Sequence, residues 1–257
     1  MLQLDNNWQL SPIPGETGQS FIGIKGDERA FIKKNTTPLL ATLAKEAITP
    51  RLLWTKRAPS GDILSAQEWV DGKILTAGEI VNFIEIPEIL AHLHSSSTLL
   101  SMAQKLNISV KSPEVLYNEF VMQADLKLLN NGYLTKVIDE LRTFPAFSRH
   151  DFSLIHGDVN HRNWIISGNH VYLVDWDRAC IGDKLCDISY LLTHYIDKKY
   201  WKQWFYAYGK NLNAEVYPVF KWYAELNFLN QVHQFYAAGD NYRFNRELAL
   251  LKKLRDE

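Results

Sequence analysis

Two groups of polar residues in this chain have the types and the spacing that chemistry requires. The first contains Asp158 and, five residues on, Asn163; the second begins with Asp175, twelve residues after Asn163, at the end of the hydrophobic run 171–174. One loop can thus present a carboxylate as a base and an amide oxygen as a metal ligand, and a second carboxylate from a neighbouring strand can complete the metal site. This arrangement, HxDxxxxN followed by a strand and an Asp, predicts phosphoryl transfer from ATP with Mg²⁺.

The expected roles follow from the chemistry of each side chain. Asp158 is the candidate catalytic base, which accepts the proton of the attacking hydroxyl, and Asn163 and Asp175 are the candidate metal ligands. His156 is better suited to a structural hydrogen bond than to proton transfer. Asp, Asn and Gly are also common in ordinary turns. The two groups together, in this order and each after a strand, favour the catalytic interpretation.

A lysine on a strand and a carboxylate on the next helix should accompany such a site, because the ammonium group contacts the nucleotide phosphates and the carboxylate holds it. Lys33 follows Phe31 and Ile32 at the end of a strand-like run, and Glu46 lies thirteen residues further on in a predicted helix. Lys34 is the alternative lysine. Since side chains alternate along a strand, Lys33 shares the face of Phe31. We therefore expect a Lys33–Glu46 pair.

Two further segments are candidates for contacting the nucleotide. Residues 14–20 lie between the first two predicted strands and could place backbone amides and hydroxyl groups against the phosphates; the candidates are Gly15, Thr17, Gly18 and Ser20. This loop lacks the full GxGxxG pattern, so it could also be an ordinary hairpin turn. Residues 67–70, around Glu68, lie where the sheet should meet the helices, and their backbone could contact adenine.

The segments that carry these candidate residues predict a small sheet joined to a larger helical part. Thr37 and Pro38 should begin a helix within the sheet region, where short apolar runs predict strands at 8–13, 20–24, 30–33 and 63–69. Beyond this region, apolar residues three and four apart predict helices at 76–94, 113–129 and 133–141. Two short strands are expected at 154–155 and 171–174, and a solvated helix end at 248–257.

The expected fold is α+β, a bilobal protein-kinase-like fold with a small antiparallel-sheet N-terminal lobe and a mainly helical C-terminal lobe. The first lobe, 1–70, should bind the nucleotide. The second lobe, 71–257, should carry the catalytic loop and the acceptor site.

Composition restricts the partners. The chain has 257 residues and a formal net charge of -1, so no overall basic field exists to attract nucleic acid or an anionic membrane. No apolar stretch reaches the length that spans a membrane, and the N-terminus lacks the pattern of a signal peptide. Two cysteines, Cys180 and Cys186, do not form a disulfide framework. We expect a reduced, cytoplasmic protein that contacts neither nucleic acid nor membrane directly.

The catalytic residues also carry a resemblance. The segment 156–163, HGDVNHRN, with Asp175-Trp176-Asp177, resembles the signature of the aminoglycoside phosphotransferase and choline/ethanolamine kinase superfamily. Segments 12–15, 31–33, 66–69 and 72–76 extend the resemblance over nearly the whole chain, to kinase-like cell-cycle regulators of low-GC Gram-positive bacteria. The resemblance implies ATP, Mg²⁺, a sugar acceptor (ribose or 2-deoxyribose), and links to the replication initiator and cell-division proteins. It implies the same roles for Lys33, Asp158, Asn163 and Asp175.

The sequence leaves the identity of the acceptor open. The short stretch after Asp175 has no room for a long activation segment, which favours a small-molecule acceptor over a protein. Four residues could contact it: Asp177, Asp183, Asp187 and Trp222. Asp187 is better explained as a helix cap. Choline, ethanolamine or an aminoglycoside is the alternative acceptor, and a nucleotide-binding scaffold that regulates replication without turnover is the alternative function. The intact set of catalytic residues favours an enzyme.

Overall fold

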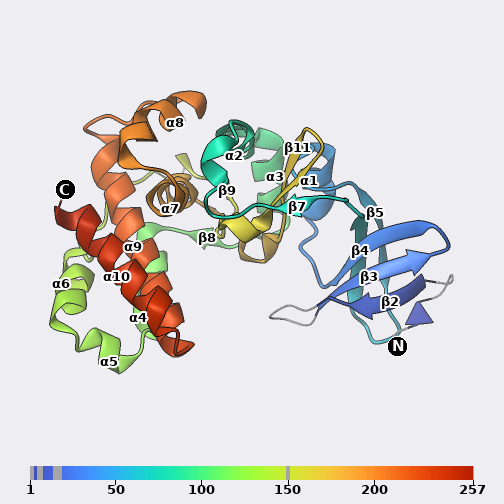
Figure 1. Ribbon diagram of the computed structural model, residues 1–257, viewed down its shortest axis with the longest axis horizontal. Helices are drawn as coiled ribbons and strands as arrows, with labels where there is room; N and C mark the ends of the chain where they lie inside the picture. The colour runs from blue at the N-terminus through green and yellow to red at the C-terminus, as the bar shows by residue number, and fades with distance from the viewer. Residues whose placement is uncertain (1–2, 5–7, 14–18, 149–150, 257) are drawn as a thin grey trace.

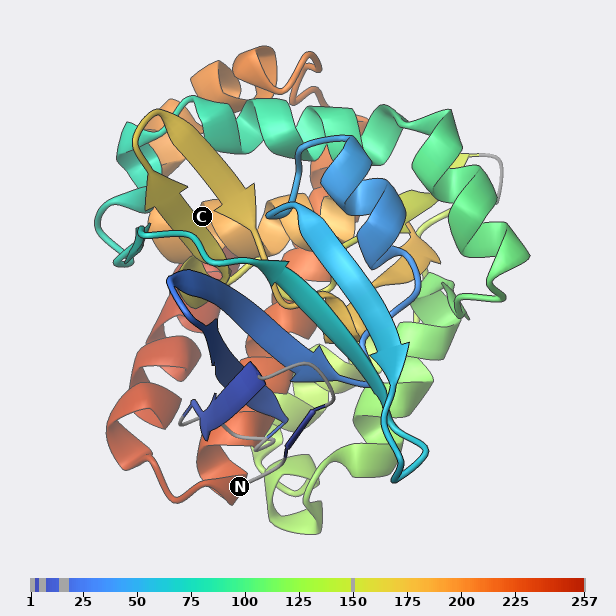
Figure 2. The same ribbon diagram turned by 90° about the vertical axis from the view of Figure 1, so that its right-hand side faces the viewer.

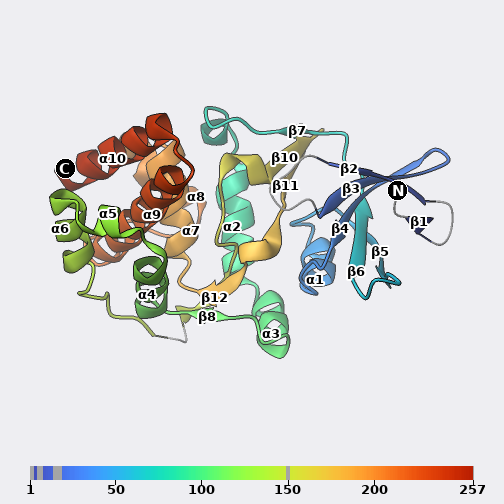
Figure 3. The same cartoon turned by 90° about the horizontal axis from the view of Figure 1, so that it is seen from below.

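Figure 1 shows the computed structural model of the chain, which describes residues 3–4, 8–13, 19–148 and 151–256. A sheet from the N-terminal part forms one end of the molecule, and helices of the C-terminal part form the other. Two small sheets lie between these ends (Figure 3). The predicted α+β class, with a sheet region followed by a helical region, is confirmed. None of the helices in the described ranges has the length and apolar character needed to cross a membrane.

The N-terminal sheet has six strands in the order β1-β2-β3-β4-β6-β5, all antiparallel to their neighbours. The strands are β1 (Gln3–Leu4), β2 (Trp8–Pro12), β3 (Ser20–Lys25), β4 (Glu28–Lys34), β5 (Leu52–Arg57) and β6 (Ile63–Glu68). Ala30 and Ile32 of β4 are buried in a small core with Trp8. Because side chains alternate along a strand, Phe31 and Lys33 lie on the opposite face. Figure 2 looks onto this sheet, with the rest of the molecule behind it.

The strands predicted at 8–13, 20–24, 30–33 and 63–69 are confirmed as β2, β3, β4 and β6. Strand β5 was not predicted. It lies at the edge of the sheet, and its half-buried residues alternate with exposed ones, so that none of its six residues is fully buried. An edge strand of this kind carries only a weak apolar pattern, because its place in the sheet depends on its neighbour.

The helix inserted between these strands, α1 (Leu40–Lys45), begins later than its expected cap. Thr37 Oγ1 accepts a hydrogen bond of 3.3 Å from the backbone N–H of Leu39, which organises the turn before the helix. The apolar residues in and around α1 pack into the main core with the helical part, and not into the small core of the sheet; they are Leu39, Leu40, Leu43 and Ile48. Helix α1 therefore ties the sheet to the helices.

The helical part contains α2 (Glu85–Ser95), α3 (Ser97–Lys105), α4 (Pro113–Gln123), α5 (Leu126–Leu129), α6 (Gly132–Glu140), α7 (Leu185–Tyr195), α8 (Trp201–Ala207), α9 (Val216–Ala237) and α10 (Asn241–Asp256). The helices predicted at 113–129 and 133–141 are found as α4 with α5, and as α6. The helix predicted at 76–94 is found as α2 only from Glu85 on; before it, Ile80–Asn82 form one short 3-10 turn. Helix α3 was not predicted. Ser96 breaks the helical run with an extended backbone and caps α3 by accepting a hydrogen bond from the Leu99 N–H.

Strands of two small sheets precede the polar loops that contain Asp158 and Asp175. One has the order β11-β10-β7 and the other the order β8-β12-β9. Their strands are β7 (Lys73–Ile74), β8 (Val110–Lys111), β9 (Ser153–Ile155), β10 (Trp164–Ser167), β11 (His170–Leu173) and β12 (Cys180–Gly182). The strands predicted at 154–155 and 171–174 are confirmed as β9 and β11. Strand β9 ends just before His156, and β11 ends two residues before Asp175.

Helix α10 differs from the expectation of a solvated helix end. Glu247, Leu251 and Leu254 are at most 5% exposed, and α10 packs along α9. These residues are four and three positions apart, so they form one face of the helix. The carboxylate of Glu247 lies 3.0 Å from Nε2 of His194 on α7 and 2.7 Å from the Arg246 guanidinium. The end of the chain is therefore part of the core.

Candidate active site

Lys33 joins the sheet to the loop that follows β11. Its ammonium nitrogen lies 2.7 Å from Oδ1 of Asp175 and 2.8 Å from Oδ2 of Asp177. Burial lowers the pKa of Lys33, but hydrogen bonds to the two carboxylates, with their charges, outweigh burial and raise it. Lys33 is therefore protonated at neutral pH. Lys34 instead points its ammonium group to the Asp62 carboxylate, at 3.3 Å.

The expected pair between Lys33 and Glu46 is wrong. Helix α1 ends at Lys45, so Glu46 is its C-cap residue and turns toward the neighbouring helices. Its carboxylate accepts a hydrogen bond of 2.9 Å from Ser96 Oγ and lies 2.9 Å from Nε2 of His92. The charge of Lys33 is instead balanced by the carboxylates of Asp175 and Asp177, which only the tertiary fold brings to it.

Asp187, on the first turn of α7, holds the backbone of the candidate catalytic loop, residues 156–163. Its two carboxylate oxygens accept hydrogen bonds from the N–H of His156, at 2.7 Å, and from that of Gly157, at 2.9 Å. Nε2 of His94 lies 3.2 Å from the same carboxylate, and Nδ1 of His94 lies 2.9 Å from the Tyr208 hydroxyl. Asp187 is only 1% exposed. The start of the loop is thus anchored by a buried carboxylate thirty residues further along the chain.

The expectation that Asp187 caps its helix is therefore wrong. The N-cap residue of α7 is Lys184, and the Oδ1 of Asp183, one residue before it, accepts a hydrogen bond of 2.8 Å from the Leu185 N–H. Burial alone would raise the pKa of Asp187, but the hydrogen bond and the charge of His94, together with the hydrogen bond from the His156 N–H, outweigh it, and the pKa is lowered. Asp187 therefore stays ionised and acts only as an acceptor.

Gly157 is required by the close approach of two chain segments. Its φ is +75°, in the left-handed region, and a Cβ atom there would lie 2.5 Å from the carbonyl oxygen of Arg178. A side chain at this position would therefore force apart the loop and the segment after Asp175.

His156 links the two polar groups rather than acting as a base. It is fully buried, its Nε2 lies 3.0 Å from the Val174 carbonyl, and its Nδ1 accepts a hydrogen bond of 3.2 Å from the Asp158 N–H. These two bonds require the neutral tautomer with the proton on Nε2. Burial lowers the pKa of His156, in agreement with a neutral ring.

Asp158 and Asn163 are oriented by local hydrogen bonds. Asn160 Nδ2 donates to Oδ1 of Asp158 at 2.6 Å, and among the described residues nothing donates to Oδ2. Asn163 Nδ2 donates to the Asp158 carbonyl at 2.8 Å. Because its NH₂ group faces the loop, the side-chain oxygen of Asn163 points the other way. The Asn163 carbonyl in turn accepts from the Val174 N–H at 2.9 Å, which fixes the loop beside Asp175.

The far end of the loop is held by Tyr195 of α7. Its hydroxyl lies 3.1 Å from both the backbone nitrogen and Nδ1 of His161. The neighbouring residue, His194, pairs with Glu247 of α10. Two neighbouring residues of α7 therefore hold the candidate catalytic loop and the last helix.

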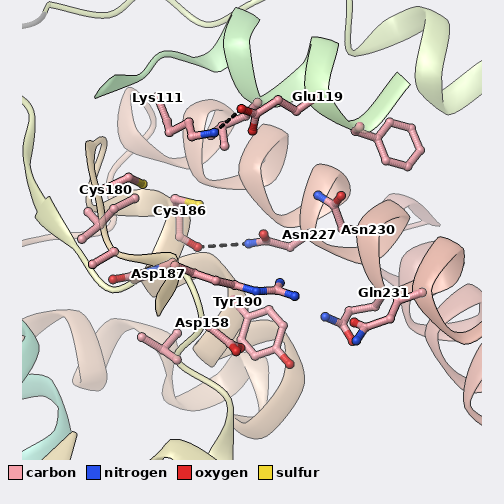
Figure 4. A pocket seen from close by; sticks show the side chains of 18 of the residues that line it. Lys111, Glu119, Asp158, Cys180, Cys186, Asp187, Tyr190, Asn227, Asn230 and Gln231 are labelled. Atoms are coloured by element: carbon pink, nitrogen blue, oxygen red, sulfur yellow. Dashed lines mark hydrogen bonds and ion pairs between the residues drawn. The ribbon is translucent and has the colours of Figure 1, made fainter. Parts of the chain in front are cut away.

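Two cavities meet at these residues. The larger is about 690 Å³ and contains Asp158 in its wall, whereas the smaller, about 380 Å³, contains Lys33, Asn163 and Asp175. Asp177 lines both cavities. In Figure 4, Asn227 and Asn230 of α9 lie between Asp158 and the ion pair of Lys111 and Glu119; further residues of the larger cavity are Arg178, Asp187, Tyr190, Gln231 and Gln234.

The other predicted nucleotide contacts have mixed outcomes. Ser20 and Glu68 line the smaller cavity, and the Glu68 carboxylate pairs with Arg51 at 3.2 Å. Gly15, Thr17 and Gly18 lie outside the described residues. Of the four candidates for acceptor contact, Asp177 and Asp187 line the larger cavity. Asp183 and Trp222 do not, and Trp222 is buried in the core, where its Nε1 donates to the Leu141 carbonyl.

Sequence reasoning missed the amide side chains of α9. Asn227, Asn230, Gln231 and Gln234 are three and four residues apart, so they share one face of the helix and line the larger cavity. This spacing was a usable signal. It was hidden because the aromatic residues of α9 dominate the apolar pattern.

Comparison with known proteins places this site in a family. The model of the phosphotransferase enzyme family, APH, matches residues 33–223, which is more than half of the chain and runs from Lys33 past Asp187. The chain belongs to the phosphotransferase enzyme family. The loop 156–163, Asp175 and the residues of the larger cavity that precede α9 lie within the matched range, whereas the α9 residues of that cavity, from Asn227 on, lie beyond it.

Solved structures of phosphotransferases have the same fold. A choline/ethanolamine kinase family protein from Mesorhizobium loti has a TM-score of 0.68 at 17% identity, over 98% of this chain and 90% of that one. The choline kinase LicA from Streptococcus pneumoniae has a TM-score of 0.66 at 14% identity, over 95% and 93%. Aminoglycoside 2'-phosphotransferase-IIIa has a TM-score of 0.65 at 16% identity, over 98% and 94%. The expected kinase-like fold is therefore confirmed.

Proposed function

We propose that this phosphotransferase transfers the γ-phosphate of ATP to a hydroxyl group of a small sugar, ribose or 2-deoxyribose. The observation that supports this most is the sorting of residues between two adjoining cavities. The candidate base, Asp158, lies in the wall of the larger cavity, and the candidate phosphate and metal contacts lie in the smaller one. Asp177 belongs to both, so a donor in one cavity and an acceptor in the other would meet beside it.

The smaller cavity is the proposed nucleotide site. Related solved structures hold AMP in LicA, GDP in aminoglycoside 2'-phosphotransferase-IIIa and ADP in spectinomycin phosphotransferase. In this chain Lys33 would contact the phosphates, with Ser20, Glu68 and the loop residues Gly15, Thr17 and Gly18 as further nucleotide contacts. The nucleotide lobe is proposed as 1–70, and the lobe of the catalytic loop and acceptor as 71–257.

Asn163 and Asp175 suit a magnesium ion that is shared with nucleotide phosphates. The described residues contain no cluster of three or more His, Cys, Asp or Glu side chains that could hold a metal alone. Mg²⁺ commonly takes only one or two protein ligands and completes its shell with phosphates and water. The Asp175 carboxylate and the outward-facing oxygen of Asn163 supply such a pair. Bound there, the ion would neutralise charge on the phosphates.

The proton of the acceptor hydroxyl goes to Asp158 in this proposal. Oδ1 of Asp158 already accepts from Asn160, so Oδ2 is the oxygen that is free to receive it. As the O–H bond breaks, the hydroxyl oxygen forms the new bond to phosphorus and the bond between phosphorus and the leaving oxygen of ADP breaks. Lys33 holds a positive charge beside the phosphates during this step. His156, neutral and fully bonded, keeps the loop in place.

The larger cavity suits a neutral polyhydroxy compound better than a cation. Three of its four carboxylates have partners: Glu119 pairs with Lys111, Asp177 pairs with Lys33, and Asp187 holds the loop. The fourth is Asp158, the proposed base. Arg178 adds a positive charge with no ion-pair partner in the described part of the chain. Amide side chains supply much of the remaining polar lining; they are Gln123, Asn227, Asn230, Gln231 and Gln234. The Asn227 nitrogen already donates to Cys186 and Ser189, so Asn227 offers its oxygen as an acceptor. This balance disfavours choline or a polycationic aminoglycoside.

The biological role proposed here rests on the sequence resemblance. We propose that the enzyme acts in the cytoplasm as a cell-cycle regulator linked to replication initiation, with the replication initiator and cell-division proteins as partners.

The acceptor is tested by ADP release from ATP and Mg²⁺ with a panel of compounds. Ribose or 2-deoxyribose should stimulate release, and mass spectrometry should detect the phosphorylated sugar. Choline, ethanolamine and kanamycin should not stimulate release. Stimulation by the cations alone would overturn the sugar assignment. ATP binding with no acceptor that stimulates turnover would favour a nucleotide-binding scaffold.

Asp175→Ala should weaken magnesium-dependent binding of ADP by at least about tenfold, because it removes a metal ligand. Binding is measured by isothermal titration calorimetry with Mg²⁺ and with excess EDTA. Asp177→Asn is the matched control, since it also removes a carboxylate from Lys33 without removing the proposed ligand. Equal ADP affinities for wild type and Asp175→Ala in Mg²⁺ would show that Asp175 holds no metal.

A further inference from the structure

Gln67, at the end of β6, has a side-chain amide that is held in one orientation. Its Nε2 lies 2.8 Å from the carbonyl oxygen of Pro50 and 3.1 Å from Oγ1 of Thr49. Both hydrogens of the NH₂ group are therefore in use. Because the Pro50 carbonyl oxygen can only accept, the nitrogen of the Gln67 amide must face Pro50, and Oε1 must face away from it. Thr49 and Gln67 are both buried, at 1% and 8% exposure, which limits rearrangement.

The other end of the amide opens into the smaller cavity. Oε1 of Gln67 has no hydrogen-bond donor among the described residues, and it is not among the fully enclosed unpaired atoms of this part of the chain. Gln67 itself lines the cavity. The side chain therefore presents a fixed hydrogen-bond acceptor to whatever occupies this space.

The position of Gln67 corresponds to the base end of a nucleotide. On the paired strands, Gln67 lies opposite Phe31, and Lys33 lies two residues further along β4 on the same face. Two residues of strand span about 7 Å, so the backbone positions of Gln67 and Lys33 are offset along the sheet by roughly the width of a ribose. Apolar side chains line the cavity on this side and suit a flat ring; they include Pro50, Val70, Ile74 and Ile165.

Adenine and guanine differ at the ring position that would meet such an acceptor. Adenine carries an exocyclic amine, which donates, whereas guanine carries a carbonyl oxygen, which accepts. We propose that Oε1 of Gln67 accepts a hydrogen bond from the exocyclic amine of adenine and makes this site select adenine over guanine nucleotides. This inference rests on the proposed nucleotide site. Guanine would place two acceptors against each other in a buried position, where unpaired polar groups are costly.

The test compares the affinities of ADP and GDP, measured with Mg²⁺ and without acceptor by displacement of a fluorescent adenine nucleotide. Wild type should bind ADP at least about tenfold more tightly than GDP, since a buried unpaired acceptor costs this much or more. Gln67→Leu should reduce this ratio severalfold toward one, mainly by loss of ADP affinity. Thr49→Val, which frees one hydrogen of the amide and changes the shape of the site little, should give a smaller reduction.

Ser65→Ala is the matched control. Ser65 is a buried polar residue of β6 two positions from Gln67, its hydroxyl bonds to Thr36 and to the Lys33 carbonyl, and it does not line the cavity. This variant should keep the wild-type ratio. A wild-type ratio near one, or an unchanged ratio in both Gln67→Leu and Thr49→Val, would overturn the inference and leave the proposed function intact. Binding of neither nucleotide would overturn both.

Discussion

Asp158→Asn is expected to lower the rate of phosphoryl transfer by about 10²- to 10⁴-fold, the usual contribution of a general base. The substitution removes the group that receives the hydroxyl proton and changes little else. The backbone carbonyl of Asp158 still accepts from Asn163, its N–H still donates to His156, and the amide oxygen of the new side chain can still accept from Asn160. The loop should therefore keep its shape.

The measurement is kcat with a saturating acceptor, together with the affinity for ADP and Mg²⁺. ADP affinity should change by less than about twofold, because Asp158 lines the larger cavity and the nucleotide contacts line the smaller one. Asp139→Asn is the charge-matched control: Asp139 is exposed on α6 and lines neither cavity. Turnover at the wild-type rate in Asp158→Asn would remove Asp158 from the role of base.

Asp187→Ala is expected to lower the free energy of unfolding by about 3–5 kcal/mol and to lower turnover by about 10²-fold or more. The variant leaves the N–H groups of His156 and Gly157 and the ring of His94 without their buried acceptor. The backbone that carries Asp158 then loses its anchor, and a displacement of about 1 Å is enough for a loss of this size. Urea unfolding and kcat are the two measurements.

The dependence of stability on pH distinguishes an ionised Asp187 from a residue that only fills space in the core. The pKa of Asp187 is lowered in the folded state, so its stabilisation is present above the ordinary value of 3.8 and is lost as the pH falls below it. Asp187→Asn, which keeps the shape and one acceptor oxygen, should be less stable than wild type at neutral pH. The difference should shrink as the solution is acidified past that value. A difference that stays constant with pH would contradict an ionised anchor.

The local parts of this site could be predicted from the sequence, and the parts made by distant contacts could not. Asp158, Asn163 and Asp175 lie within one short stretch, where the order of polar residues and strands is itself informative. Lys33 could be chosen over Lys34 because strand alternation is a local rule. The roles of these residues in catalysis stay predictions until they are tested.

The errors had a common physical cause. Glu46 was assigned to Lys33 by analogy of position, but the direction of its side chain depends on where α1 ends and what packs against it. Asp187 sits on the first turn of a helix, and only the fold reveals that its partners are the N–H groups of a loop thirty residues earlier. The orientation of the Gln67 amide likewise depends on Pro50, seventeen residues away.

The packing of helix α10 determines whether the gene can tolerate a stop codon near its end. The buried Glu247 pairs with His194, whose neighbour Tyr195 holds the catalytic loop at His161. An early stop codon that removes only this helix would leave the signature motif complete in the translated chain. It would also expose the face of α9 that α10 covers, and it would remove Glu247, the partner of the buried His194. We therefore expect such an allele to be a null allele, although every residue of the signature is still encoded.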